Sequence, residues 1–445
     1  MHKALRVFLF AWLAAALLSA CSSLTPEAPA GLEAQALLTV TSEGDSGPGS
    51  LREAITNATP GDTITFAEGV TTITLSSYLY IDKDLSIVGP EGSSVTLSGN
   101  NAVRVLTTDS NTAVELRNLT ITAGGAGDGS GSGIVNQGTL TVANSTISGN
   151  STDFYGGGIL NAGSLTLINS TIADNDAAWD GGGIINYATL TITNSTVSGN
   201  HAGYEGGGIL NHGILTVTNS TVSGNSAYFS GGGIISYNTL AVINSTISRN
   251  SAEGGIGGGI LSTGALAVTN GTVSGNSAAG HGGGIYDDGG ALTLDNSIVA
   301  LNSGSDDFPD IYGNISSGSD NLVGGNPGLE LGGDGKPNLA DNGGPTQTIA
   351  LLADSPALDA ADPASCPATD QRGVTRPQGS GCDIGAFELE VAPVLSPLEM
   401  VDNLITQVKG LGLHRGTERA LVAQLGAARR LLVRGQDDAA VRVMN

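Results

Sequence analysis

Short runs in which apolar and polar residues alternate fill the middle of the chain. In Leu215-Thr216-Val217-Thr218-Asn219, for example, the aliphatic residues stand two positions apart, which is the period of a half-buried strand. Most of these positions carry β-branched residues, and glycine or asparagine bounds each run. No stretch between residues 131 and 302 shows the apolar stripe of a helix. The pattern therefore predicts short strands joined by tight corners.

The same pattern returns about every 25 residues. Triple glycines begin at Gly156, Gly181, Gly206, Gly231, Gly257 and Gly282. A fixed period of this length is typical of a solenoid in which each copy forms one coil. Three short strands per copy predict an all-β fold, a parallel β-helix of roughly ten coils. Irregular strand-rich sequence on both sides extends this domain over residues 38–325.

A single coil is too small to be stable alone. It buries four or five aliphatic side chains, each worth about 1.5–3 kcal/mol, whereas ordering the backbone costs about 1–2 kcal/mol per residue. Stacked coils share backbone hydrogen bonds and one continuous core. The repeat is therefore expected to fold only as a stack.

Asparagine recurs at two positions of the repeat. The first set is Asn144, Asn169, Asn194, Asn219, Asn244, Asn270 and Asn296, and the second is Asn150, Asn175, Asn200, Asn225, Asn250, Asn276 and Asn302. Asparagine tolerates the left-handed backbone of a sharp corner, and amides stacked at the strand spacing bond one another. We expect two structural asparagine ladders.

The ends of the stack need caps because they expose unpaired strand edges and an open core. Ser50 and Glu53 have the spacing of a helix capping box. They predict a short N-terminal helix that lays Leu51 and Ile55 over the open end.

The last part of the chain changes to a helical pattern. A proline-containing linker is expected over residues 391–400, followed by a small helical tail over residues 401–445. Thr417 is the candidate N-cap and Gly435 the stop of its main helix, and Asp437 opens a second one. The tail is similar to small helical modules of bacterial surface proteins but lacks their final helix, which indicates an incomplete module.

Residues 1–21 indicate export. Lys3 and Arg6 precede an apolar run that ends at Leu18 and is too short to span a bilayer. The sequence Leu18-Ser19-Ala20-Cys21 resembles a lipobox, which implies that Cys21 carries the lipid and that residues 22–37 form a linker. Ser22 follows this cysteine, and a residue other than aspartate at that position resembles the outer-membrane sorting rule of Gram-negative lipoproteins. The alternative is an ordinary signal peptide with an incidental cysteine.

The charge of the chain limits the classes of molecule that it can bind, and its cysteines predict a disulfide. The chain has a net charge of −24, and Arg249 is the sole lysine or arginine between residues 118 and 335. Such a surface repels nucleic acid and anionic lipid, so no nucleic-acid partner is expected. We expect the negative charge mainly to keep the rod soluble, and the alternative is that it attracts cations. Cys366 and Cys382 lie close together in an exported chain, which predicts a disulfide.

Two resemblances support this organisation. Gly49-Ser50-Leu51-Arg52-Glu53-Ala54-Ile55 resembles the start of bacterial surface right-handed β-helix proteins with the pectate-lyase-like fold, although many relatives have cysteine at Gly49. The Gly-Gly-Gly-Ile and Ser-Gly-Asn elements are also similar to repeats of polymorphic outer-membrane proteins. That kinship is looser, because Val197, Val222 and Ile247 stand where those repeats have phenylalanine.

Residues 326–390 resemble the choice-of-anchor Q domain of bacterial surface proteins. Five motifs occur in order: Asn326-Pro327-Gly328-Leu329, Asp341-Asn342-Gly343-Gly344-Pro345-Thr346-Gln347-Thr348, Ser355-Pro356-Ala357-Leu358-Asp359, Thr369-Asp370-Gln371-Arg372-Gly373 and Cys382-Asp383-Ile384-Gly385-Ala386-Phe387-Glu388. The resemblance implies a location at the cell surface, for which we expect the outer membrane. It implies no activity.

No catalytic constellation emerges from the sequence. A hydrolase needs two positioned carboxylates, and the acidic clusters are Asp174, Asp176 and Asp180, and Asp306, Asp307 and Asp310. His201, His212 and His281 fall in different coils and corners, which favours neither a metal site nor a Ser/His/Asp triad. We therefore expect no enzyme, no metal and no cofactor. The alternative is a polysaccharide lyase or glycoside hydrolase.

Aromatic residues gather just before the triple glycines. They are Phe154, Tyr155, Trp179, Tyr204, Tyr228 and Phe229. Stacked coils align these corners into a ridge of rings beside carboxylates, which suits sugar faces and hydroxyls. Alternatively, the rings only shield their corners from water. The sequence thus predicts a surface lipoprotein with a structural or adhesive role that binds glycans or proteins.

Overall fold

The computed structural model describes residues 36–125, 129–305, 308–390 and 396–444. It divides into two compact units, and the boundary between them in the sequence falls between Leu389 and Glu390. The larger unit is a parallel β-helix, and the smaller unit is helical. The predicted fold class is therefore confirmed, including the N-terminal cap helix and the small helical tail.

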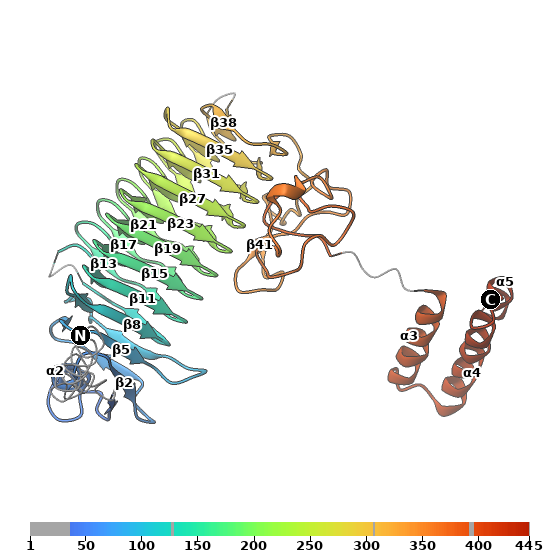
Figure 1. Ribbon diagram of the computed structural model, residues 1–445, viewed down its shortest axis with the longest axis horizontal. Coiled ribbons are helices and arrows are strands. Elements are labelled where there is room, and N and C mark those ends of the chain that lie inside the picture. Colours follow the sequence, from blue (N-terminus) through green and yellow to red (C-terminus); the bar gives the residue numbers. More distant parts are fainter. Residues whose placement is uncertain (1–35, 126–128, 306–307, 391–395, 445) are drawn as a thin grey trace, which may run out of the picture. The chain divides into compact units, whose positions relative to one another are not determined.

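Three long parallel sheets, here called A, B and C, run the length of the β-helix. Figure 1 shows the strands of sheet A stacked in chain order. Sheet A contains β1 (Leu37–Val40), β2 (Asp62–Phe66), β5 (Leu85–Val88), β8 (Ala113–Arg117), β11 (Thr139–Ala143), β15 (Ser164–Ile168), β19 (Thr189–Thr193), β23 (Ile214–Thr218), β27 (Thr239–Ile243), β31 (Ala265–Thr269), β35 (Ala291–Asp295) and β38 (Ile315–Ser317).

Sheet B follows sheet A in each coil. It contains β3 (Thr72–Thr74), β6 (Val95–Ser98), β9 (Leu119–Thr122), β12 (Thr146–Ser148), β16 (Thr171–Ala173), β20 (Thr196–Ser198), β24 (Thr221–Ser223), β28 (Thr246–Ser248), β32 (Thr272–Ser274), β36 (Ile298–Ala300) and β39 (Leu322–Val323). Strands pair in register, for example Val197 with Val222, so equivalent residues of successive coils form columns.

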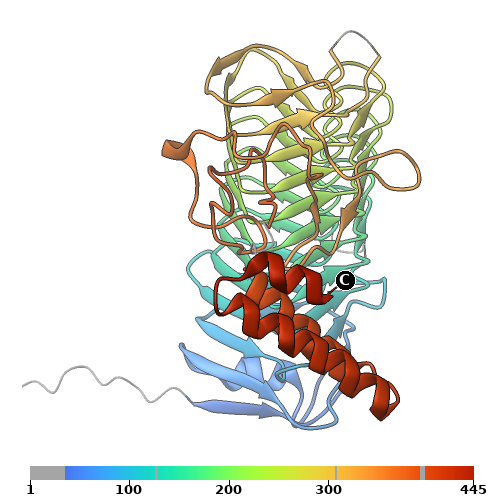
Figure 2. The ribbon, with the colours of Figure 1, turned by 90° about the vertical axis from the view of Figure 1, so that its right-hand side faces the viewer.

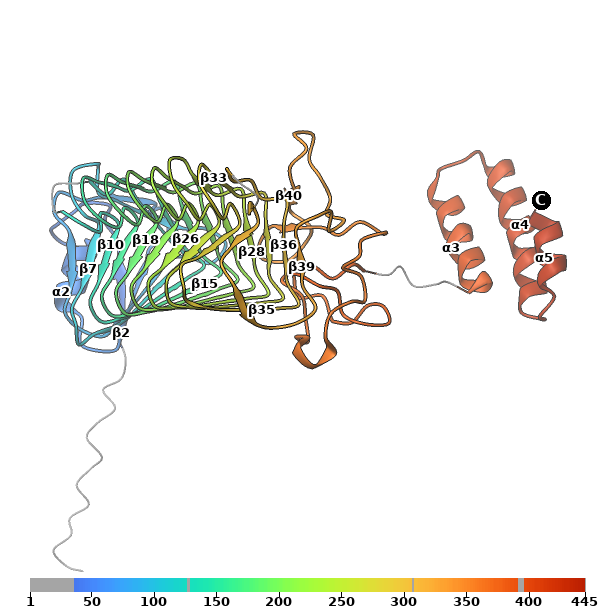
Figure 3. The ribbon, with the colours of Figure 1, turned by 90° about the horizontal axis from the view of Figure 1, so that it is seen from above.

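Sheet C completes each coil, and several of its strands are labelled in Figure 3. It contains β4 (Leu79–Ile81), β7 (Leu106–Thr108), β10 (Ile134–Asn136), β14 (Ile159–Asn161), β18 (Ile184–Asn186), β22 (Ile209–Asn211), β26 (Ile234–Ser236), β30 (Ile260–Ser262), β34 (Ile285–Asp287) and β37 (Ile311–Tyr312).

Six of the described coils have a fourth strand, whereas the sequence predicted three strands in each coil. These two-residue strands form sheet D between sheets B and C: β13 (Ser151–Thr152), β17 (Asp176–Ala177), β21 (His201–Ala202), β25 (Ser226–Ala227), β29 (Ser251–Ala252) and β33 (Ser277–Ala278). The expectation of three strands was wrong because Ser-Ala pairs look like loop in a sequence. Their small side chains, such as the buried Ala202, fit the narrow interior at this corner.

The core is a tube of aliphatic side chains. One coil contributes Ile184 from sheet C, Leu190 and Ile192 from sheet A and Val197 from sheet B, all fully buried. These four residues match the number expected from the repeat. Because the same columns continue through the neighbouring coils, the core is continuous along the stack.

Helix α2 (Leu51–Asn57) lies at the N-terminal end of the stack (Figure 3). The Glu53 amide donates to Ser50 Oγ at 3.2 Å, and Glu53 Oε2 accepts from the Gly49 amide at 2.6 Å. Leu51 and Ile55 are buried in the same core as the coils. The predicted cap is therefore present, held by the predicted residues.

Residues 326–389 pack against the coils and belong to the same compact unit. They contain the antiparallel pair β40 (Leu339–Ala340) and β41 (Thr348–Ile349) and the short helix η2 (Pro363–Ser365). Ile349 and Phe387 share a buried cluster with Ile298 of the β-helix. Figure 2 shows these orange loops beside the coils.

The helical unit contains α3 (Pro397–Gly410), α4 (Arg415–Leu432) and α5 (Asp437–Met444). The expected linker over residues 391–400 was too long, because Ser396 and Glu399 form a capping box that starts α3 at Pro397. Thr417 was also the wrong N-cap, since His414 Nδ1 accepts from the Gly416 amide at 3.4 Å. In the described part of the chain, no helix is long and apolar enough to cross a membrane.

Candidate ligand-binding face

A column of aromatic rings follows the corner that precedes sheet C. This ridge column consists of the neighbouring rings of Tyr155, Trp179, Tyr204 and Phe229. Trp179, Tyr204 and Phe229 are equivalent in the repeat, whereas Tyr155 lies one position further along its coil. The ring centroids of Trp179 and Tyr204 lie 6.5 Å apart, and those of Tyr204 and Phe229 lie 4.5 Å apart. Trp179 is 52% exposed. Tyr204 and Phe229 are exposed as well. Three successive coils, those of Trp179, Tyr204 and Phe229, therefore present rings to solvent in one line.

Two further predicted ridge residues lie beside this column. The Tyr228 ring meets the Phe229 ring edge-on at 5.0 Å, and both side chains are exposed. Phe154 is exposed as well, and its carbonyl oxygen accepts from the Trp179 amide at 3.1 Å. The six predicted ridge residues thus lie on one part of the surface.

Glycine makes these sharp corners feasible. Gly206, which follows the ridge residues of its coil, has a φ of 67°, a left-handed conformation that other residues rarely adopt. A Cβ on the next residue, Gly207, would collide with the Ser226 carbonyl oxygen. The triple glycine therefore turns the chain tightly and lets adjacent coils approach.

A second aromatic column, which sequence reasoning missed, consists of Tyr187, His212 and Tyr237. The Tyr187 and His212 rings stack at 5.2 Å with an interplanar angle of 1°, and the His212 and Tyr237 rings stack at 5.0 Å and 15°. Each residue directly follows a strand of sheet C. Alignment of the repeats at this position would have revealed the column.

An aliphatic row lies between the two columns. Its members are Ile185, Leu210, Ile235 and Leu261, the central residues of β18, β22, β26 and β30. The central residue of such a strand points away from the tube, yet Ile235 is fully buried. This row packs against Tyr155 in a small hydrophobic cluster of its own. Tyr155 therefore covers part of an outward apolar stripe.

Two carboxylates lie beside the rings on adjacent coils. The Glu205 amide donates to Asp180 Oδ1 at 3.1 Å, and Tyr237 Oη donates to Glu205 Oε2 at 2.7 Å. Burial raises the pKa of Asp180, and the negative charge of Glu205 adds to this effect. Burial lowers the pKa of His212, although the negative charge of Glu205 opposes this effect. We call the two columns, the aliphatic row and these carboxylates the aromatic face.

The asparagine sets differ in their roles. All seven residues of the first set have left-handed backbones, with φ between 47° and 51°. In the second set the side chains form a buried ladder, for example from Asn175 Nδ2 to Asn200 Oδ1 at 2.9 Å. A third ladder was missed, in which Asn161 Nδ2 donates to Asn186 Oδ1 at 2.7 Å. These residues maintain the coils.

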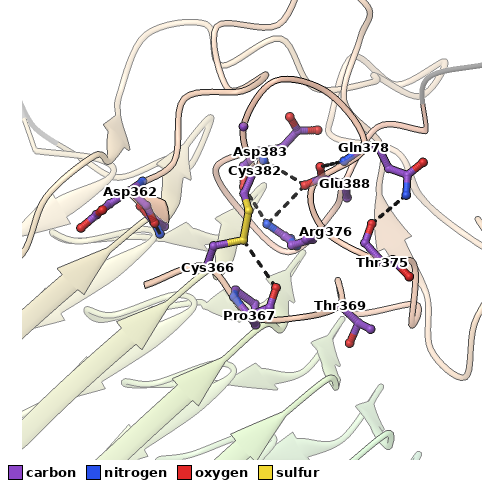
Figure 4. Close-up of a disulfide and its surroundings, with 12 residues drawn as sticks. Asp362, Cys366, Pro367, Thr369, Thr375, Arg376, Gln378, Cys382, Asp383 and Glu388 are labelled. Atoms are coloured by element: carbon purple, nitrogen blue, oxygen red, sulfur yellow. Dashed lines mark hydrogen bonds and ion pairs between the residues drawn. A yellow bond between two sulfur atoms is a disulfide. The ribbon is translucent and has the colours of Figure 1, made fainter. Parts of the chain in front are cut away.

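The predicted disulfide between Cys366 and Cys382 is present, whereas Cys21 lies outside the described residues. Figure 4 shows the disulfide beside a buried charge cluster. An Arg376 nitrogen lies 3.6 Å from a Glu388 oxygen, and both side chains are buried. Burial raises the pKa of Glu388 and lowers that of Arg376. This cluster holds the loops together.

The remaining acidic and basic candidates do not converge. Asp176 Oδ1 lies 2.8 Å from His201 Nδ1 on the exposed sheet D, and Ser226 is the next residue of that column. Asp310 Oδ1 extends the buried asparagine ladder. Arg249 occupies a corner and donates to the Pro337 carbonyl oxygen at 2.9 Å.

The other candidates add no site. Asp306 and Asp307 lie outside the described residues, and His281 stacks on Tyr312 at 4.9 Å. Throughout the described ranges, no group of three or more His, Cys, Asp or Glu side chains could hold a metal ion.

Comparison with known proteins identifies the fold alone. No family model and no curated protein matches the chain. A solved structure, described as the crystal structure of pectate lyase Pel9A, is similar with a TM-score of 0.52 and 14% identity. The match covers 80% of this chain and 97% of the other. It supports the pectate-lyase-like β-helix and, at this identity, does not extend to activity.

Proposed function

We propose that this chain is an exported, surface-anchored lipoprotein whose β-helix binds glycans through the aromatic face. The observation that carries this proposal is the pair of ring columns on either side of the row that contains Leu210, with Asp180 and Glu205 beside them. Rings offer apolar surfaces to sugar faces, and carboxylates accept hydrogen bonds from hydroxyl groups. Such a surface suits adhesion to an extended polysaccharide.

The anchoring part of the proposal rests on the sequence. Cys21 follows an export signal with a lipobox, and residues 326–390 carry the five motifs of an anchor-associated domain. Expression of the full chain in a bacterial host tests it. We expect Cys21→Ser to move the protein from the membrane fraction to the soluble fraction. Unchanged fractionation would contradict lipid attachment at Cys21.

The binding part is tested with a glycan array probed with residues 22–445. We expect saturable binding to some glycans and a loss of at least about tenfold in affinity for Trp179→Ala and for Tyr204→Ala, because each exposed ring supplies stacking surface. Tyr80→Ala is the matched control, since Tyr80 is exposed to a similar extent on sheet C but lies outside both columns. Absence of binding to every glycan would refute the proposal.

A polysaccharide-active enzyme is the second candidate. Its supporting observation is that Asp180 and Glu205 lie on adjacent coils and that the pKa of Asp180 is raised, as in a general acid. Release of shortened or unsaturated oligosaccharides from a bound glycan, abolished by Asp180→Asn, would establish this candidate. Binding without product release would favour the adhesin.

A further inference from the structure

The two carboxylates of the aromatic face, Asp180 and Glu205, have no lysine or arginine in their own coils. Arg104 lies at the N-terminal end of the ridge column, where it donates to the Ser130 and Gly131 carbonyl oxygens in the coil before Tyr155. Arg249 is the sole lysine or arginine between residues 118 and 335, and its guanidinium faces the Pro337 carbonyl oxygen and Asp334, which lies 3.8 Å away. On the described surface, therefore, no lysine or arginine of these coils stands beside the two ring columns.

The two carboxylates of the face have neutral hydrogen-bond donors. Asp180 accepts from a backbone amide, and Glu205 accepts from the Tyr237 hydroxyl. Burial lowers the pKa of His212 and so disfavours a positive charge on its imidazole beside Glu205. Burial and the neighbouring Glu205 both raise the pKa of Asp180. A ligand with positive charge would relieve this repulsion.

The rings favour the same kind of ligand. An ammonium group is attracted to the face of tryptophan or tyrosine by the ring quadrupole. Trp179 directly precedes Asp180, Tyr204 directly precedes Glu205, and both rings are exposed. A uronate polymer would instead bring like charges together, which is unfavourable.

We propose that the aromatic face selects polysaccharides that carry free amino groups, a proposal that rests on the glycan-binding function above. Coils repeat at about 4.8 Å, close to the rise of one sugar in an extended β-linked chain. A glycan lying along the stack therefore places one sugar near each of Trp179, Tyr204 and Phe229. Because successive sugars of such a chain are flipped, the ammonium group of one sugar faces the neighbouring carboxylates of Asp180 and Glu205, and the next ammonium group points away.

The test compares three oligosaccharide series on residues 22–445 by calorimetry at about pH 6 and low salt. The series are oligomers of glucosamine, the same oligomers fully N-acetylated, and oligouronates. We expect the glucosamine oligomers to bind about fivefold or more tightly than the acetylated ones from the trimer upward. Added salt should weaken the binding of the charged series only. Oligouronates should not bind.

Charge-removing variants locate the effect. Asp180→Asn and Glu205→Gln keep the shape and an acceptor oxygen but remove the charge, so we expect the preference for glucosamine oligomers over acetylated oligomers to disappear, whatever happens to the affinity that both series share. Glu68→Gln and Glu91→Gln remove the same charge from exposed positions of the first coils and should have no effect. Equal losses in all four variants would show that net charge alone attracts the amine.

The outcomes separate this inference from the proposed function. Equal affinity for amine and acetylated oligomers, or tighter binding of oligouronates, overturns the amine preference but leaves glycan binding intact. Absence of binding to all three series and to the wider array overturns both.

Discussion

At the residue scale, the two asparagine sets support different kinds of contact. Asn200 accepts from the Asn175 amide and side chain at 3.1 and 2.9 Å and donates to the Ile172 carbonyl oxygen at 3.0 Å. Asn194 instead supplies a left-handed corner, with a φ of 50°. The same residue type thus serves hydrogen bonding at one corner and backbone geometry at another.

This difference predicts unequal costs of substitution. We expect Asn200→Ala to lower the free energy of unfolding by about 3 kcal/mol, because several buried polar groups lose their partners. Asn194→Ala should cost only about 1 kcal/mol, the penalty for a left-handed alanine, and Asn194→Gly still less. Urea unfolding of the three variants measures these values. Similar losses for Asn200→Ala and Asn194→Ala would contradict the assignment.

Because the pKa of Asp180 is raised, we expect removal of its charge to stabilise the fold in a pH-dependent way. Its pKa is raised by burial and by Glu205, so the folded state binds this proton more tightly than the unfolded state. The group therefore favours folding below the unfolded pKa of about 3.9 and loses that contribution as pH rises through the folded pKa.

The variant Asp180→Asn keeps an acceptor for the Glu205 amide. We expect it to gain up to about 1 kcal/mol at pH 7, reduced by solvent screening at this half-exposed position, and to gain nothing at about pH 3. Thermal unfolding at the two pH values measures the gain. A loss of stability at pH 7 would mean that the charge has a favourable partner in the folded protein.

At the element scale, the sequence predicted what the repeat expresses at one position in every copy. Residue types at fixed positions of the repeat predicted the strands of sheets A, B and C and the core columns. The α2 cap lies outside the repeat and followed from the spacing of Ser50 and Glu53. The second aromatic column did not emerge because its members, Tyr187, His212 and Tyr237, differ in type and meet only through strand register. Sheet D was missed because its strands have two residues.

Contacts between distant segments were also beyond the sequence. Gln371 is buried and reaches back to the coils, where its Nε2 donates to Thr221 Oγ1 at 2.9 Å and its Oε1 accepts from Thr246 Oγ1 at 2.7 Å. It also donates to Thr346 Oγ1 at 2.8 Å within its own loops. No local pattern indicates partners so far away in the chain.

These hydrogen bonds predict that Gln371 holds the loops over residues 326–389 against the coils. We expect Gln371→Ala to weaken this docking by about 2 kcal/mol, because the hydroxyls of Thr221 and Thr246 lose a buried partner. Hydrogen exchange should rise in the loops but not in the coils. Gln378→Ala is the control, since that side chain bonds only the nearby Thr375 carbonyl oxygen among the described residues. Equal effects of both variants would exclude a special role for Gln371.

At the scale of the whole molecule, the two units are stabilised in different ways. The β-helix has one aliphatic core that runs through all its coils, so its stability depends on neighbouring coils. The helical unit has its own buried residues, such as Val401 and Ala428. Arg429 Nε also lies 2.5 Å from Asp402 Oδ1 between α4 and α3. Each unit therefore contains the contacts that its own fold requires.

This independence predicts the effect of deletion. A chain that ends at Leu389 should lose the helical circular dichroism signal yet keep the unfolding midpoint of the β-helix within about 1 °C, because the removed residues form a separate compact unit. In the full chain, Asp402→Asn should slightly lower only the helical transition, because Asp402 loses its ion pair with Arg429. A β-helix midpoint that drops by several degrees on deletion would show that the acidic coils and the basic helices stabilise each other.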